Sequence, residues 1–256
     1  MIQQILVSIS NRILHIQINR PEKKNALTQA MYSAMSDAIA QAEGDAAVRV
    51  IVISGHEGAF TAGNDIADFV QSPPAGEDSP VFRFLRTIST AKKPIVAAVN
   101  GVAVGIGTTM LLHCDLVYAG HGARFQLPFV NLGLVPEAGS SLILPQMIGH
   151  RRAAELLLLG DPFNAETAHE LGIVNSVVAD GDVLATALHA ATQLAAKPPH
   201  ALRLSKQLLK QHSGAAVQAA MTEEGAHFAT LLTSPEAAEA LQAFLEKRKP
   251  DFSRFE

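Results

Sequence analysis

Hydrophobic side chains recur with two different periods along this chain. Residues 2–19 alternate apolar and polar positions on either side of residues 10–12, which predicts two strands joined in a hairpin. Residues 27–45 instead carry a moderate apolar stripe at helical spacing, and Gly44 is a typical helix end. The run at 48–54 is β-rich and predicts a buried strand. The chain therefore opens with strands and a helix in alternation.

This alternation continues toward the middle of the chain. A loop is expected at 71–80, helices at 81–90 and 106–113, and strands at 95–99 and 116–120. Such an order is typical of an α/β fold, in which helices cover a mostly parallel sheet.

Beyond residue 150 the pattern becomes almost entirely helical. Only residues 173–179 interrupt it with a strand-like run. No low-complexity linker separates the two parts. We therefore expect an α/β core over residues 1–195 and a packed helical region over residues 196–256.

One apolar run has an alternative interpretation. Residues 94–112 carry no charge and include Gly101-x-x-x-Gly105, a pattern also seen in membrane-spanning helices. Against a membrane span, the first part of the run is β-rich and Asn100-Gly101 is a strong turn signal. We favour a strand, a glycine turn and a helix in a protein without a membrane span.

Charge and cysteine content narrow the possible partners. The formal net charge of −4 gives no overall attraction to nucleic acid. Cys114 is the only cysteine, so an internal disulfide is impossible and no thiol cluster exists for a metal. These features favour a reducing, cytoplasmic compartment, and we expect no metal or redox cofactor.

Two glycine-rich turns, at 58–65 and 100–107, each lead into a predicted helix. Neither matches the P-loop or the G-x-G-x-x-G pattern, so nucleotide binding of those kinds is not indicated. Free backbone N–H groups at a helix start favour an anion, and two that face one point form an oxyanion hole. Spacing alone leaves open whether these are simply two tight turns.

Five segments together resemble the enoyl-CoA hydratase/isomerase (crotonase) family, in the family's order and spacing. They span nearly the whole chain, at 18–27, 58–69, 92–120, 158–178 and 243–252. The resemblance implies an α/β crotonase-like superhelix of repeated ββα units with a C-terminal helical region used for trimerisation. It also implies acyl-CoA as the substrate, with coenzyme A as part of that substrate, and a homotrimer or hexamer of such chains.

The resemblance further implies that the N–H groups of Ala62 and Ile106 polarise the thioester oxygen. The family usually has glycine at the position of Ile106, and a backbone donor survives that change. Residues 62–66 are implied to lie beside pantetheine and adenine. The other residues that the resemblance assigns to substrate or coenzyme A are Lys23, Ala26, Gly63, Asn64, Asp65, Ile66, Thr109, Phe129, Phe228, Phe244 and Lys247.

Both acids of the family's hydratases are missing. Ungapped counting places Thr109 at the position of the first acid and Phe129 at the second. A threonine hydroxyl can bind a water but is no base near neutral pH, and phenylalanine can do neither. Efficient hydration by the two-carboxylate route is therefore not expected.

Glu137 is the remaining candidate base. Its segment, LVPEAGSS, resembles the Pro-Glu-Gly-x-Ser-Ser segment of the peroxisomal-type Δ3,Δ2-enoyl-CoA isomerases, in which that glutamate is the sole base. The alternative is an ordinary first-turn helix residue that follows Pro136. A helix start lowers a carboxyl pKa and an apolar surrounding raises it, so a working base requires the second effect to dominate.

Other polar residues have simpler interpretations. Asp65 and Asp68 suit helix capping, Asp115 suits the anchoring of a strand, and His113 suits a buried, hydrogen-bonded position. Lys23, with Arg20 and Lys24, is a candidate for the coenzyme A phosphates, although loop charges are usually only solvated. Plain core packing is an equal alternative for the phenylalanines.

We therefore predict a Δ3,Δ2-enoyl-CoA isomerase with Glu137 as its base. The alternatives are an enoyl-CoA hydratase or another crotonase-type acyl-CoA enzyme, and a non-catalytic acyl-CoA binder. Some crotonase relatives bind RNA through a lysine-rich helix, but residues 28–43 contain no Lys or Arg, so no nucleic-acid partner is expected.

Overall fold

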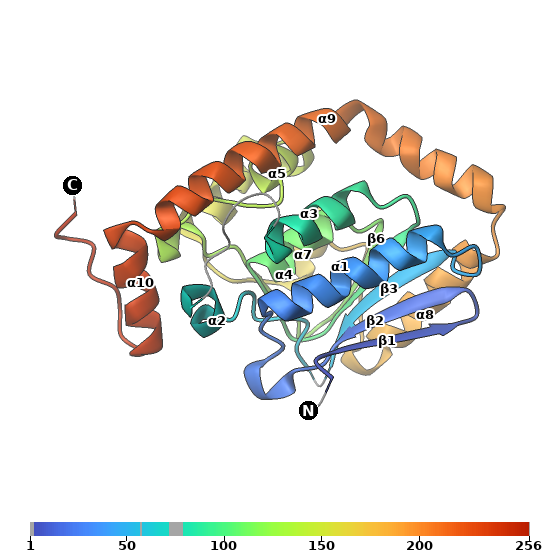
Figure 1. Cartoon of the computed structure of the whole chain (residues 1–256), viewed down its shortest axis with the longest axis horizontal. Helices are drawn as coiled ribbons and strands as arrows, with labels where there is room; N and C mark the ends of the chain where they lie inside the picture. The colour runs from blue at the N-terminus through green and yellow to red at the C-terminus, as the bar shows by residue number, and fades with distance from the viewer. Residues whose placement is uncertain (1–2, 57, 72–78, 256) are drawn as a thin grey trace.

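The computed structural model describes residues 3–56, 58–71 and 79–255. Its central feature is a six-stranded sheet with the strand order β1-β2-β3-β4-β6-β9 (Figure 1). β1 is antiparallel to β2, and every later pair of neighbours is parallel, as predicted for an α/β fold. The strands are β1 (Ile5–Ser10), β2 (Ile13–Ile18), β3 (Val50–Gly55), β4 (Ile95–Val99), β6 (Leu116–Gly120) and β9 (Ser176–Val178).

The predicted hairpin at the start of the chain is confirmed. Ser10 pairs with Ile13, which leaves Asn11 and Arg12 as a two-residue turn with φ of 49° and 67°. Two positive φ values in succession give the turn a twist that matches the flanking strands.

Helices cover both faces of the sheet. α1 (Gln29–Gly44) and α3 (Pro80–Thr90) lie together over one face, and α8 (Val183–Ala195) lies over the other (Figure 1). The side chains of β3 alternate between the two cores: Ile51 and Ile53 face α1, whereas Val50 and Val52 face α8. The uninterrupted apolar run of this strand therefore reflects burial on both faces.

A second, three-stranded sheet was not predicted. It has the order β5-β7-β8, with β5 (Val102–Val104), β7 (Arg124–Gln126) and β8 (Phe163–Asn164). β8 also corrects the expectation of a single strand beyond residue 150. Each of these strands is only two or three residues long, too short to show a period of two.

The apolar run at 94–112 does not form one helix, so its membrane interpretation is wrong. It divides into β4, β5, α4 (Ile106–Thr109) and the 3₁₀ turn η2 (Met110–His113). Within the described ranges, no helix combines the length and apolar character that crossing a bilayer requires. The loop expected at 71–80 falls mostly outside the described residues.

Beyond α8 the chain is helical. A single 34-residue helix, α9 (Pro199–Leu232), includes Ser213-Gly214, and α10 (Pro235–Leu245) follows apart from the sheet (Figure 1). The shorter elements are η1 (Pro21–Lys23), α2 (Ile66–Gln71), η3 (Val130–Leu132), α5 (Ser140–Ile148), α6 (His150–Ala154), the π-helical turn η4 (Glu155–Leu159), α7 (Ala165–Glu170) and η5 (Asp180–Asp182).

Candidate active site

The two glycine turns pack directly against each other. Thr61 N donates to Val102 O at 3.0 Å, and Val104 N donates to Thr61 O at 3.0 Å. A Cβ added to Gly107 would lie 2.9 Å from Thr61 O, so only glycine fits at this approach. The start of α4 is therefore held against the segment that leads to α2.

The N–H of Ile106 has no acceptor among the described residues, whereas the N–H of Ala62 is bonded. Ile106 is the first residue of α4, after Gly105 with φ of 56°, so its N–H has no acceptor within the helix. Ala62 N instead donates to Lys24 O at 3.0 Å. The expectation that the Ala62 N–H faces a thioester is therefore corrected, because this donor is already bonded.

The next backbone donor along the segment is that of Asn64. Gly63 N donates to Thr61 Oγ1 at 3.1 Å and Asp65 N donates to Leu27 O at 2.9 Å. Between them, the N–H of Asn64 meets no acceptor in the part of the chain that the structure describes. Asn64 N and Ile106 N are therefore donors of the two packed turns for which the described residues offer no acceptor.

Glu137 lies on neither α5 nor any other helix. α5 begins at Ser140 with Gly139 as its N-cap, so the interpretation of Glu137 as a first-turn helix residue is wrong. The side chain is buried, with 5% of the residue exposed, and Thr109 Oγ1 lies 3.4 Å from its Oε1. Burial first, and then the negative charge of Glu224, raise the Glu137 pKa to about 8, against a lowering by the Thr109 hydrogen bond.

The backbone around Glu137 forms a tight turn. Ala138 and Gly139 have φ of 63° and 73°, and the left-handed conformation is uncommon for a residue with a Cβ. Ser140 Oγ donates to Glu137 O at 2.6 Å. His113 Nε2 lies 2.8 Å from Ala138 O and donates to it, because a carbonyl can only accept. The predicted buried, hydrogen-bonded role of His113 is thereby confirmed, and burial lowers its pKa to about 4.

Tyr32 belongs to the same region and was not predicted. Its side chain comes from α1, is 1% exposed, and its hydroxyl donates to Asn64 Oδ1 at 2.5 Å. Burial, followed by the negative charges of Glu137 and Asp68, raises the Tyr32 pKa, so the phenol stays protonated. The available signal was a hydroxyl group on the apolar stripe of residues 27–45.

The carboxylates near the first turn have the structural roles predicted for them. Asp65 Oδ1 accepts from the N–H groups of Ala67 and Asp68 at 3.0 and 3.1 Å, which caps α2. Its Oδ2 accepts from Arg20 at 2.6 Å, so this guanidinium, a candidate for phosphate binding, is already paired. Asp68 Oδ2 in turn accepts from Gln29 N at 2.9 Å, at the start of α1.

Asp115 anchors β4 to α9. Its Oδ2 accepts from Ile95 N at 2.7 Å and from Lys206 Nζ at 2.6 Å. Four residues further along α9, Lys210 Nζ donates to His113 O at 3.0 Å. The expected role of Asp115 in holding a strand is confirmed, and the N-terminal half of α9 is attached to the end of the sheet.

The residues expected to bind coenzyme A do not all meet in a single chain. Lys23 is exposed in η1 and Ala26 is partly buried beside it. Phe228 packs edge-on against Phe69 of α2, with ring centroids 6.0 Å apart. Phe244, at 61% exposure, belongs to α10, which stands apart from the sheet (Figure 1). Lys247, also exposed, follows that helix.

The two positions at which hydratases of the family carry acids, Thr109 and Phe129, are both buried. Thr109 is fully buried beside the Glu137 carboxyl, and Phe129 is buried with 4% exposure. Among the described residues, His, Cys, Asp and Glu form no group of three that could hold a metal ion.

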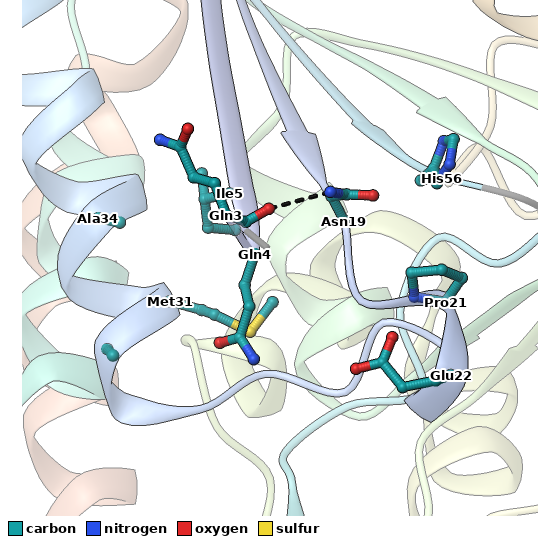
Figure 2. A pocket seen from close by; sticks show the side chains of 10 residues that line it. Gln3, Gln4, Ile5, Asn19, Pro21, Glu22, Met31, Ala34 and His56 are labelled. Carbon is teal, nitrogen blue, oxygen red and sulfur yellow. Dashed lines mark hydrogen bonds between the residues drawn. The ribbon is translucent and has the colours of Figure 1, made fainter. Parts of the chain in front are cut away.

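A cavity of about 750 Å³ lies elsewhere, between the start of β1, the end of β2 and α1 (Figure 2). Asn19 Nδ2 donates to Gln3 O at 2.9 Å at its rim. Its lining contains none of the predicted site residues and is formed by Gln3, Gln4, Ile5, Asn19, Pro21, Glu22, Ala30, Met31, Ala34 and His56.

The chain is similar in sequence and structure to known proteins. Residues 8–254 match a family model described as enoyl-CoA hydratase/isomerase. The chain is 35% identical to the 2,3-dehydroadipyl-CoA hydratase of Escherichia coli K12, covering 97% of this chain and 98% of that protein. It is also 35% identical to enoyl-CoA delta isomerase 2 of Rattus norvegicus, covering 96% of this chain and 64% of that protein. The structure of Pseudomonas aeruginosa OdaA is 50% identical, with a TM-score of 0.93 over 95% of this chain and 99% of that one.

Proposed function

The chain belongs to the enoyl-CoA hydratase/isomerase family and has the crotonase fold, and we propose that it isomerises 3-enoyl-CoA to 2-enoyl-CoA thioesters. The observation that carries this proposal is the buried Glu137 carboxyl, whose pKa is raised to about 8 and which accepts a hydrogen bond from Thr109. Relatives of equal identity are named hydratase and isomerase, so overall similarity does not choose between the two reactions.

The reaction requires one base that acts twice. The Glu137 carboxylate removes a proton from C2 of the 3-enoyl thioester, and the electron pair moves into the thioester carbonyl to give a dienolate. The resulting carboxylic acid returns its proton to C4, the carbonyl reforms, and the double bond lies between C2 and C3. A base with a pKa near the working pH is well suited to both steps.

In this proposal the dienolate oxygen accepts from the N–H groups of Ile106 and Asn64. Both belong to the packed glycine turns, and neither has an acceptor in the part of the chain that the structure describes. Loss of one such donor typically costs about 2.7–4 kcal/mol of transition-state stabilisation. Tyr32 holds the Asn64 side chain and so contributes to the position of that donor.

Hydration is the second candidate, because several relatives are named enoyl-CoA hydratases. A hydratase must orient and deprotonate a water, and here Thr109 offers only a hydroxyl while Phe129 offers no polar atom. Water addition with Glu137 as the only acid would therefore be slow.

The test is a direct comparison of the two reactions. Purified protein and its Glu137→Gln variant are assayed for isomerisation of 3-enoyl-CoA and for hydration of 2-enoyl-CoA. Isomerisation should exceed hydration, and Glu137→Gln should reduce it by about 10²- to 10⁴-fold. Dominant hydration would reverse the assignment, and retention of thioester binding without either reaction would identify a non-catalytic binder.

Assembly into a homotrimer or hexamer is part of the same proposal. Large apolar side chains are exposed on the C-terminal helices, namely Leu204, Leu208, Leu209, Phe244 and Leu245. In an oligomer, Phe244 and Lys247 of one chain would be able to reach the coenzyme A site of another. Light scattering of the purified protein measures the number of chains directly.

A further inference from the structure

Glu224 is a buried carboxyl that the proposed reaction does not use. It lies within α9, with 6% of the residue exposed, and no cation in the described part of the chain forms an ion pair with it. Both carboxyl oxygens accept from backbone instead: Oε2 from Gly139 N at 2.6 Å and Oε1 from Ser141 N at 2.9 Å. Burial of a carboxyl group raises the free energy of the folded state unless hydrogen bonds satisfy its oxygens. The two backbone donors that bond Glu224 therefore indicate what this side chain does.

These two bonds cap α5 from another helix. Gly139 is the N-cap residue of α5, and no side chain of its own segment caps it. The first N–H groups of a helix lack partners within the helix, and a negative charge there is favourable. Glu224, 85 residues further along the chain, supplies what the sequence around Gly139 lacks.

The capped turn is the one that carries Glu137. Gly139 follows Glu137 by two residues, and a Cβ at Gly139 would lie 3.2 Å from Val217 and 3.4 Å from Met221, both on α9. α9 therefore contacts the turn through packing and through two charge-assisted hydrogen bonds. Glu137 precedes Gly139 by only two residues. A substitution at Glu224 that displaces Gly139 is therefore expected to displace the Glu137 carboxyl as well.

A small set of titratable groups acts on Glu137 and Glu224. Glu137 is near Glu224 from α9 and Tyr32 from α1, and its turn accepts from His113 of η2. His113, with its lowered pKa, is neutral near pH 7. Asp68 contributes to the raised pKa of Tyr32. Burial first, and then the charge of exposed Glu223, raise the pKa of Glu224, against a lowering by its hydrogen bonds from Ser141 and Gly139. The negative charge of Glu224 is the one charge that raises the Glu137 pKa.

We propose that Glu224 is a positioning residue for the base: it fixes the turn of residues 137–141 and keeps a negative charge beside Glu137. The inference rests on the proposed role of Glu137 as the base. Glu224 itself touches neither the substrate nor the reacting atoms in this scheme. Its two effects, geometry and charge, are separable by substitution.

The experiment compares E224Q, E224D and the control E223Q by the pH profile of kcat/KM, by kcat and KM, and by circular dichroism. E224Q keeps the shape but loses the charge and can accept only one of the two N–H bonds. Its kcat should fall by about 10- to 100-fold with little change in KM, because small misplacements of a catalytic group are expensive. The acid limb of the kcat/KM profile of E224Q should also move to lower pH, because removal of a neighbouring negative charge lowers the Glu137 pKa.

E224D keeps the charge but shortens the side chain, so kcat should fall while the acid limb stays near its wild-type position. E223Q removes an exposed charge one residue away and should leave both quantities unchanged. An E224Q variant with wild-type kcat and an unmoved limb would overturn the inference. If E224Q does not fold, E224D decides, and a wild-type kcat in E224D overturns it. Full activity of Glu137→Gln would instead show that Glu137 is not the base. The Glu224 variants test only the positioning role, so the two proposals can fail separately.

Discussion

Thr109 Oγ1 donates to Glu137 Oε1 across 3.4 Å, in a region where both side chains are buried. The contact joins α4, which begins with the proposed donor Ile106, to the turn that carries the proposed base. A hydroxyl at this place stabilises the ionised carboxylate without adding a second acid. The position expected to hold one of the two hydratase acids therefore serves the single carboxylate instead.

The Thr109 hydroxyl should tune the basicity of Glu137. Thr109→Val removes a hydrogen bond that lowers the Glu137 pKa, so the acid limb of the isomerisation profile should move to higher pH. This shift is opposite in sign to that expected for E224Q. The control Thr108→Val loses the 2.6 Å bond to Ala103 O and should lower stability without moving the limb.

The isomerisation rate should depend on pH through Glu137. The base must be ionised, and burial raises its pKa to about 8, so kcat/KM should rise with pH up to about 8 and then level off. Stopped-time assays from pH 5 to pH 10 in buffers of constant ionic strength measure this. A rate already constant from pH 5 would contradict a buried, protonated Glu137.

The free energy of unfolding should fall with rising pH over the range in which the isomerisation rate rises. In the folded state Glu137 retains its proton up to about pH 8, whereas in the unfolded chain it loses it near its reference value of 4.5. Its contribution to the free energy of unfolding is therefore fully present below about pH 4.5 and is lost as the pH rises through 8. Glu137→Gln should gain stability relative to wild type between pH 5 and pH 9, by on the order of a few kcal/mol. Urea unfolding at the two pH values checks this, and an equal difference at both would contradict it.

Asn25 should be essential for the loop that holds Ala62. It is fully buried, its Nδ2 donates to His56 O at 3.0 Å and Ala59 O at 2.7 Å, and its Oδ1 accepts from Arg20 N at 2.8 Å. Asn25→Ala removes these three hydrogen bonds and should cost at least about 1–3 kcal/mol in the free energy of unfolding. The more exposed Asn19, whose Nδ2 donates to Gln3 O, provides the control, and Asn19→Ala should cost much less.

Two glycines should respond to alanine in opposite ways. A Cβ at Gly101, which has φ of 61°, would lie 1.7 Å from Gly58 O, so Gly101→Ala should destabilise the fold by more than about 4 kcal/mol. Gly214 lies inside α9 with nothing within 4 Å of an added Cβ. Gly214→Ala should therefore stabilise the protein by up to about 1 kcal/mol. Thermal melting of both variants distinguishes these signs, and similar melting temperatures would contradict the packing at Gly101.

The hydrophobic pattern within a single segment was sufficient to predict several helices and strands. The hairpin and α1 were predictable because their side chains follow one period over five or more residues, and β3 and β4 because each is a run of β-rich apolar residues. Glu137 was found through its motif, but its helical context was predicted wrongly, because Pro136 suggested a helix start that comes only at Ser140.

The remaining errors and omissions concern partners far apart in the chain. Ala62 was the wrong donor because its N–H is taken by Lys24 O, a pairing that only the folded loop reveals. Tyr32 and Asn64 are 32 residues apart, and Glu224 and Gly139 are 85 residues apart. No periodicity within a single segment reports such contacts.

The unbroken course of α9 has a consequence for the permitted length of this chain. Lys206 bonds Asp115 near the start of the helix, and Glu224 bonds Gly139 of the Glu137 turn 18 residues, or about five helical turns, later. One residue inserted between them would rotate the far half by about 100° and carry Glu224 away from Gly139. The helix therefore accepts exchanges of side chains far more readily than an insertion or deletion, and the spacing between Lys206 and Glu224 is itself a determinant of the active site.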